Sequence, residues 1–222
     1  MHHMWINTTD YTIPQLILCA TGAVGWVLVY VLIIRETRRT KFVEIPLFVA
    51  CGDIVWEFLW GFVFNDRINM GVLFVWSYRA WFLVDIVLFI GLWRYGYKQF
   101  DIAVLRRHAK PIIAGLSLAF AAIISAFVIT GLDNPMGAQT AYLLNFGIST
   151  LYIVDWLRLH KRQHYSKSVA WAKMLGTLVY SVFFRLRFPE YYSILALSIV
   201  IFMLDCIYLW LLYNYKEEEQ AE

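Results

Sequence analysis

Long, uninterrupted apolar blocks make up most of the sequence, and they limit the possible fold more than any other feature. A helix needs about 20 mostly apolar residues to cross the ~30 Å hydrocarbon core of a bilayer. In lipid every backbone polar group has to be paired internally, so blocks of this length are expected to be helices. Seven blocks qualify, and they predict spans at 13–34, 43–64, 73–96, 111–131, 138–158, 168–185 and 191–214.

Composition supports lipid as the solvent of this chain. Hydrophobic residues make up 61% and charged residues 16%, whereas soluble domains have about 45–50% and about 25%. The links between the blocks are too short to form a separate domain, and only segment 97–110 is longer; we expect it on the membrane surface. The sequence therefore predicts an all-α, integral, multi-pass membrane protein in which residues 1–222 form a single seven-helix transmembrane domain.

Basic residues gather in alternate links, which predicts the orientation in the membrane. They are Arg35, Arg38, Arg39, Lys41, Lys98, Arg106, Arg107, Lys110, Arg158, Lys161, Arg162, Lys167 and, in the tail, Lys216. The positive-inside rule then places the N-terminus outside and the C-terminus in the cytoplasm. The net charge of +3 thus reflects topology and contact with anionic lipid headgroups, and we expect no nucleic-acid partner.

Several membrane chemistries need residues that the predicted spans lack. A haem or di-iron centre needs histidines within spans, but all five lie in the N-terminal stub or in cytoplasmic links: His2, His3, His108, His160 and His164. No paired Asp-rich motif is present to hold magnesium diphosphate. A retinal protein needs a lysine at the centre of its last span, where this chain has Asp205. We therefore predict no metal and no cofactor.

Five carboxylic acids lie at membrane depth in the predicted spans: Asp53, Glu57, Asp85, Asp155 and Asp205. A charged acid at the bilayer centre costs on the order of 2.5–3.5 kcal/mol even on lenient scales. We expect no basic residue at mid-span to pair with them, so several should hold their proton. Asp155 lies near a span end and is expected to reach water or Arg158.

The spacing of these acids and their neighbours predicts an internal pocket. Asp53 and Glu57 are one helical turn apart on one face, and a polar stripe (Tyr142, Asn145, Ser149, Tyr152) follows the fifth span. Asp53 is expected to orient Glu57 more often than to donate a proton itself. Asp85 is equally well interpreted as a pocket residue or as a residue that forms a hydrogen bond between helices. The candidates for the pocket wall are Trp56, Trp60, Phe82, Asp85, Tyr152 and Tyr208.

Neutral acids beside aromatic rings suit carbocation chemistry. Protonating an epoxide or an alkene creates a cation, and an aromatic face in a desolvated site can stabilise a cation by ~2 kcal/mol. Several rings would supply a useful share of the ~8 kcal/mol or more that enzymes remove from a barrier.

Two short segments resemble the small integral-membrane terpene cyclases of fungal meroterpenoid and indole-diterpene pathways and their bacterial relatives: CGDIVWEF at 51–58 and LDCIY at 204–208. The resemblance extends over the whole chain in length and span number. It implies a cyclase that works by protonation without metal or diphosphate, with Glu57 and Asp205 as its acids. Many members carry an amide four residues before the glutamate, where this chain has Asp53, so Asp53 joins the catalytic candidates.

The resemblance further implies a hydrophobic, prenylated aromatic or indole substrate that enters from the bilayer. Glu57 or Asp205 would protonate its epoxide or terminal alkene, and the other acid would orient or stabilise the cation. Acids at membrane depth also suit a proton-coupled transporter or a seven-span sensor, which remains the alternative. A purely structural membrane subunit would not explain five such acids.

Overall fold

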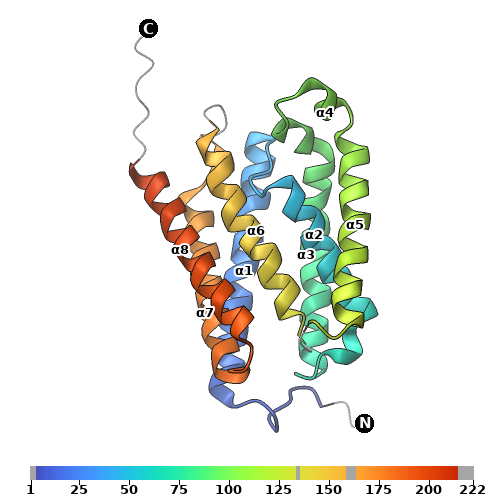
Figure 1. Cartoon of the computed structure of the whole chain (residues 1–222), viewed down its shortest axis with the longest axis vertical. Coiled ribbons are helices and arrows are strands. Elements are labelled where there is room, and N and C mark those ends of the chain that lie inside the picture. The colour runs from blue at the N-terminus through green and yellow to red at the C-terminus, as the bar shows by residue number, and fades with distance from the viewer. Residues whose placement is uncertain (1–3, 134–135, 159–163, 215–222) are drawn as a thin grey trace.

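The structure, a computed structural model, describes residues 4–133, 136–158 and 164–214. All regular elements in these residues are helical, which confirms the predicted all-α class. They are α1 (Ile13–Thr40), α2 (Leu47–Phe58), η1 (Leu59–Val63), η2 (Asn65–Arg67), α3 (Val72–Tyr95), η3 (Gly96–Gln99), α4 (Ala103–Arg107), α5 (Ala109–Ile129), α6 (Ala138–Leu157), α7 (Lys167–Arg187) and α8 (Tyr192–Asn214). The longer helices run along the long axis of the molecule, and the short α4 lies at one end (Figure 1).

Among the residues that the structure describes, five helices are long and apolar enough to cross a membrane. They are α1, the stretch Val72–Gln99 that includes α3, α5, α7 and α8. The helix α2 has only 12 residues, and polar side chains such as Asn145 and Ser149 make α6 less apolar. Each predicted span nevertheless has a helix in its place. The described chain begins at the end opposite to that where α8 ends (Figure 1).

The ends of α1 follow from its sequence. The side chain of Thr12 caps the first turn, and Gln15 completes a reciprocal capping box, with Pro14 also in the first turn. Such a box satisfies two backbone N–H groups that a helix start leaves free. Lys41 ends the helix in the left-handed conformation, with φ 55°.

The second predicted span differs most from its helix. It was expected from residue 43, but Pro46 precedes the first turn and α2 begins at Leu47. After Phe58 the chain forms a π-helical turn, in which the N–H of Phe64 donates to the carbonyl of Leu59 (2.7 Å). Such turns are rare and are frequent at functional sites. Here the turn begins two residues after Glu57.

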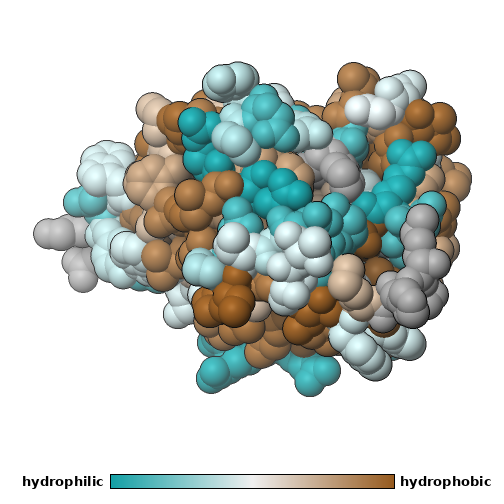
Figure 2. Space-filling view, turned by 90° about the horizontal axis from the view of Figure 1, so that it is seen from below, coloured by the Kyte–Doolittle hydropathy of each residue, from teal (hydrophilic) through white to brown (hydrophobic). Residues whose placement is uncertain are grey.

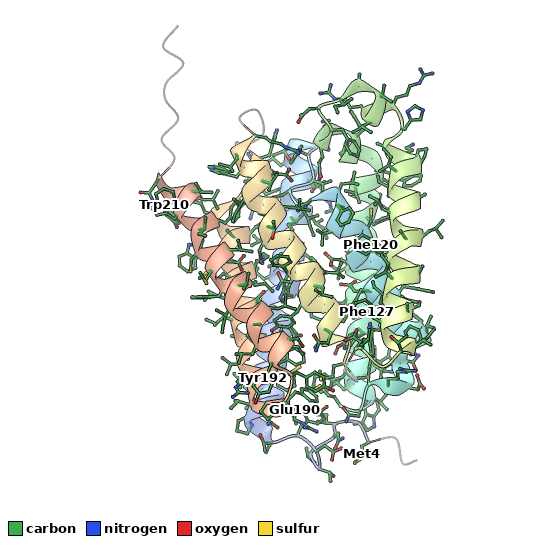
Figure 3. The ribbon with its side chains drawn as sticks, viewed as in Figure 1. Met4, Phe120, Phe127, Glu190, Tyr192 and Trp210 are labelled. Atoms are coloured by element: carbon green, nitrogen blue, oxygen red, sulfur yellow. The ribbon has the colours of Figure 1, made fainter. Side chains whose placement is uncertain are left out.

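Small residues allow the closest helix contact. A Cβ atom on Gly25 of α1 would lie 2.8 Å from the Cα atom of Gly176 on α7. Close backbone approach through small residues is typical of helix pairs in membranes. On the other side of the bundle Phe120 of α5 lies towards α2 (Figure 3), with its ring 5.1 Å from that of Phe48.

The outer surface is consistent with a lipid environment. Seen from the end where α1 begins, polar side chains gather over the middle and hydrophobic ones around the rim (Figure 2). Tyr192 and Trp210 lie near opposite ends of α8 (Figure 3) and are 73% and 62% exposed. Exposed aromatic residues at both ends of a helix are typical anchors at membrane–water interfaces.

The N-terminal segment before α1 is fixed to the start of α3. The N–H of Asn7 donates to the carbonyl of Met70 (3.0 Å), and the N–H of Leu73 donates to that of Trp5 (3.1 Å). The Tyr11 hydroxyl also bonds the Asn69 side chain. This segment therefore ties the beginnings of α1 and α3 together at one end of the bundle.

Glu44 lies in the link between α1 and α2, outside both helices, and is 2% exposed. One of its oxygens accepts the backbone N–H of Ser166 (2.9 Å), the residue before α7. Burial raises the pKa of Glu44 from its ordinary 4.5 to about 8. The folded state therefore holds this proton more tightly than the unfolded state does.

This difference predicts a pH-dependent stability. A raised carboxyl pKa gives its full stabilisation below pH ~4.5, and stability falls as the pH rises towards ~8. We expect the Glu44→Gln variant to lose this decline, because an amide does not titrate. Thermal unfolding in detergent between pH 5 and 8 measures the slope. The control is Glu36→Gln, a partly exposed acid paired with Arg39, and equal slopes in wild type and Glu44→Gln would contradict the prediction.

Candidate active site

A cavity of about 350 Å³ lies within the bundle. Its walls come from α1, α2, α3, α6 and α7, together with Met136. The size falls in the range of small-molecule binding sites, which are mostly apolar with a few polar groups. The lining includes Asp53, Glu57, Asn145 and Thr177 among many aromatic and aliphatic side chains.

Glu57 is the acid whose geometry suits proton transfer. It is 3% exposed and lines the cavity. One carboxyl oxygen accepts the hydroxyl of Tyr30 (2.9 Å), and the other has no hydrogen-bond partner among the described residues. A buried carboxyl oxygen without a partner is costly in the ionised state. The position is therefore suited to a protonated acid whose O–H is available to a ligand.

Asp53 lies in the same wall one turn earlier, as the spacing predicts. Asp85 of α3 is 1% exposed and is close enough to interact electrostatically with Glu57. It is not among the described residues that line the cavity. Three acids thus gather around the end of α2, two in the wall and one outside it.

Asp205 has a basic partner, so the expectation that no basic residue pairs with the acids was wrong. The Nζ atom of Lys173 lies 2.8 and 2.9 Å from the two carboxylate oxygens of Asp205. Ser149 completes the group, since its Oγ accepts from Lys173 (2.7 Å) and donates to Asp205 (2.9 Å). Both charged side chains are almost fully buried. This triad ties α6, α7 and α8 together.

The triad lies beside the cavity. Asp205 is not among the described lining residues, but the Ser149 hydroxyl lies 3.1 Å from the carbonyl oxygen of Asn145, and Asn145 does line it. Lys173 also interacts electrostatically with Asp53. The two catalytic candidates Glu57 and Asp205 therefore belong to two neighbouring groups and share no wall.

Of the predicted aromatic wall, the structure places Trp56 in the cavity lining. Its indole N–H donates to Thr140 Oγ1 (3.0 Å) and to the Gly137 carbonyl (3.2 Å). The Trp60 ring, fully buried, packs against Trp56 and Phe64 outside the lining.

The other wall candidates pack elsewhere. Phe82 contacts Phe58 and Phe62, because it lies on a different face of α3 from the lining residues. Tyr152 and Tyr208 stack on each other, with centroids 5.1 Å apart, in a cluster outside the cavity lining that the structure describes.

Other aromatic residues line the cavity instead. They are Trp26, Tyr30, Phe74, Tyr78, Trp81, Tyr142, Tyr180 and Phe184. Trp81 is four residues before Asp85, and that spacing could have indicated its face. Tyr142 and Asn145 from the predicted polar stripe line the cavity as well, and Asn145 donates to Thr177 (2.9 Å). Asp155 pairs with Arg158 (3.4 Å), as expected.

The arrangement provides a buried carboxyl group with one oxygen that has no hydrogen-bond partner among the described residues, a mostly apolar hollow and a lining rich in aromatic faces. Aromatic faces stabilise a nearby cation, and a low-polarity hollow excludes water that would quench one. These are the requirements for starting and guiding a carbocation reaction.

Comparisons with known proteins indicate the family of this chain. The family model described as Pyr4-like transmembrane terpene cyclases matches residues 9–218. The chain is 26% identical over 204 residues to the Pyr4-family terpene cyclase mfmH of Annulohypoxylon moriforme, covering 85% of this chain and 77% of mfmH. It is 27% identical over 179 residues to the terpene cyclase macJ of Penicillium terrestre, covering 77% and 67%.

A third relative is the terpene cyclase ascF of Acremonium egyptiacum, 26% identical over 230 residues, covering 90% of this chain and 81% of ascF. No solved structure matches the chain at a significant level. The resemblance inferred from segments 51–58 and 204–208 is confirmed, and so is the prediction of an integral, multi-pass membrane protein.

Proposed function

The chain belongs to the Pyr4-like transmembrane terpene cyclases, and from this premise we propose that it cyclises a prenylated aromatic or indole substrate by protonation. Glu57 is the proton donor in this proposal. The observation that carries it is the Glu57 carboxyl in the wall of an aromatic cavity, with one oxygen bonded to Tyr30 and the other without a partner among the described residues.

The reaction begins when Glu57 gives its proton to an epoxide oxygen or to a terminal alkene carbon of the substrate. The C–O bond breaks, or the π electrons form the new C–H bond, and a carbocation results. The π electrons of the next double bond attack this cation and close a ring. Loss of a proton, or attack by a head-group hydroxyl that then loses its proton, ends the sequence and allows Glu57 to be reprotonated.

The remaining residues have supporting roles. Tyr30 donates to the Glu57 carboxylate after transfer and stabilises it. Asp53, one turn away and facing the same cavity, orients Glu57 or accepts the final proton. Asp205 is the second acid that the family resemblance implies. Because it is paired with Lys173, we assign it the task of fixing α7 and α8 beside the cavity and supplying a fixed dipole near the cation. The start of this reaction requires no metal ion.

We further propose that α1, α2, α3, α5, α6, α7 and α8 all cross the bilayer, with the N-terminus outside. The two helices that fall short of the usual span criteria, α2 and α6, both line the cavity. Their side chains Asp53, Glu57 and Asn145 therefore face the protein interior instead of lipid.

The experiment that tests the function uses purified protein in detergent, without any ion gradient. A panel of farnesylated and geranylgeranylated phenols and indoles, with and without a terminal epoxide, is incubated with it, and the products are identified by mass and NMR. Cyclised products that depend on the protein support the proposal. Gradient-dependent uptake of the same compounds into vesicles, with no change in structure, would favour the transporter instead.

Trp56 supplies a further prediction within this function. We expect Trp56→Leu to lower kcat by about 10- to 30-fold and to alter the product ratio, because an aromatic face beside the cation is worth ~2 kcal/mol. Trp56→Phe keeps a ring and should retain most of the activity. The control is Trp76→Leu, since Trp76 is 57% exposed and lies outside the lining. An unchanged product ratio and rate in Trp56→Leu would exclude Trp56 from the wall that contacts the cation.

A further inference from the structure

Four residues line the cavity and are at the same time exposed on the outside of the bundle. They are Ala20, Val24, Leu73 and Ser77; Val24 is 68% and Leu73 45% exposed. Ala20 and Val24 are one turn apart on α1, and Leu73 and Ser77 are one turn apart on α3. Each pair therefore forms one short helical face.

The other walls are better covered. Each described lining residue of α2, α6 and α7 is buried or partly buried. The cavity therefore opens between α1 and α3. We call this opening the α1–α3 window.

Contacts at both ends limit the window. Near the end of α1, a Cβ atom on Gly91 of α3 would lie 3.1 Å from the Thr37 side chain, so the two helices touch there. At the other end the N-terminal segment bridges the helices, since Val72 and Leu73 donate to the carbonyls of Met4 and Trp5. Both helices run along the long axis (Figure 1), so the window opens on the flank of the bundle, which faces lipid.

The rim has the chemistry of a passage for hydrocarbon. Its side chains are small or aliphatic and uncharged, and Ala23 beside them adds a further small one to the lining. The only hydroxyl, that of Ser77, donates to the carbonyl of Leu73 (2.9 Å). Because the rim residues have no free polar group, an apolar chain can pass them without a desolvation cost, whereas water finds no hydrogen-bond partner there.

We propose that the α1–α3 window is the entrance through which the prenyl chain of the substrate passes from the bilayer into the cavity. The inference rests on the proposed function for the identity of the substrate. The small side chains of Ala20 and Ser77 keep this route open. A substrate already dissolved in the membrane reaches Glu57 by this route without crossing water.

The experiment closes the window with bulk. Ala20→Leu, Ala20→Trp and Ser77→Trp form a graded series, and matched controls are Val31→Trp on α1 and Leu83→Trp on α3. Val31 and Leu83 are 50% and 62% exposed and lie outside the lining. Each variant is placed in lipid nanodiscs and its thermal unfolding is compared with that of the wild type.

Two readouts are taken. One is turnover of a farnesylated phenol, and the other is photolabelling of α6 and α7 by the same phenol carrying a diazirine on its prenyl chain. We expect kcat/KM and the rate of labelling to fall by about tenfold or more in the Trp variants and less in Ala20→Leu, with a smaller change in kcat at saturation. The controls should stay within about twofold of the wild type.

The outcomes separate the entrance from the chemistry. If the Trp variants turn over the substrate and are labelled at the rates of the wild type, the proposed entrance is wrong, whereas the proposed function still holds. If the wild type is labelled but forms no cyclised product, and the Trp variants are not labelled, the entrance is supported and the proposed function is wrong. Because both substituted positions, Ala20 and Ser77, are exposed, a loss of folding is not expected. The smaller Ala20→Leu change keeps the test valid if a Trp variant unfolds.

Discussion

The Glu57→Gln variant is expected to lose cyclisation by about 10²- to 10⁴-fold in kcat, the range that a positioned general acid contributes. The substitution keeps the size of the side chain and an oxygen that accepts the Tyr30 hydroxyl. It removes the transferable proton. Since the cavity shape stays the same, the substrate KM should change little.

Two matched variants show which group gives the proton. Asp53→Asn removes the acid one turn away in the same wall and is expected to cost about tenfold or less, because Asp53 orients or accepts. Tyr30→Phe leaves the proton on Glu57 but removes the hydrogen bond to its carboxylate, and it should cost about tenfold. Single-turnover product formation in detergent measures all three. If Glu57→Gln keeps its rate while Asp53→Asn is inactive, the donor is Asp53.

The acid pair of α2 could be predicted from the sequence because it depends on one helix alone. A spacing of four residues places Asp53 and Glu57 on one face whatever surrounds them. The apolar blocks likewise predicted where each long helix lies, since hydropathy is a property of a continuous segment. The boundary at Leu47 was missed because the apolar block starts before Pro46, which fixes the actual start of α2.

The pairing of Lys173 with Asp205 could not be predicted in this way. The two residues are 32 positions apart and lie on different helices, so no periodicity connects them. Lys173 lies in the buried face of α7, which the pairing requires. A lysine inside one predicted span and an acid inside another were the available signal.

The aromatic wall shows the same limit. The pattern of a single helix shows which residues share a face. It does not show which of these faces lies against the cavity. On α3 the prediction chose Phe82, and the aromatic lining residues are Phe74, Tyr78 and Trp81. A rotation of one residue, about 100° around the helix axis, separates Trp81 from Phe82. The packing of α3 against α1 and α2, which the sequence does not encode locally, decides between them.

The second large effect is expected at the Lys173–Asp205 pair. Lys173→Met should destabilise the protein by about 3–5 kcal/mol, because it leaves the Asp205 carboxylate buried without its cation. Of the residues that the structure describes, Ser149 would remain as a hydrogen-bond donor to it. Replacing both partners, as in Lys173→Met with Asp205→Leu, removes both buried charges and should recover most of the lost stability. Denaturant or thermal unfolding in detergent compares the wild type, the single variant and the double variant.

The Asp155–Arg158 pair, which is more exposed than the Lys173–Asp205 pair, provides the control for that comparison. Its nitrogen and oxygen are 3.4 Å apart and its arginine is half exposed, so Arg158→Met should cost less than about 1 kcal/mol. The double variant also separates stability from chemistry. If it folds as stably as the wild type and still cyclises, Asp205 serves only to hold α7 and α8 in place. If it is stable but loses turnover, the charge pair acts on the cation through the field at the cavity. A single variant as stable as the wild type would mean that the pair is not formed.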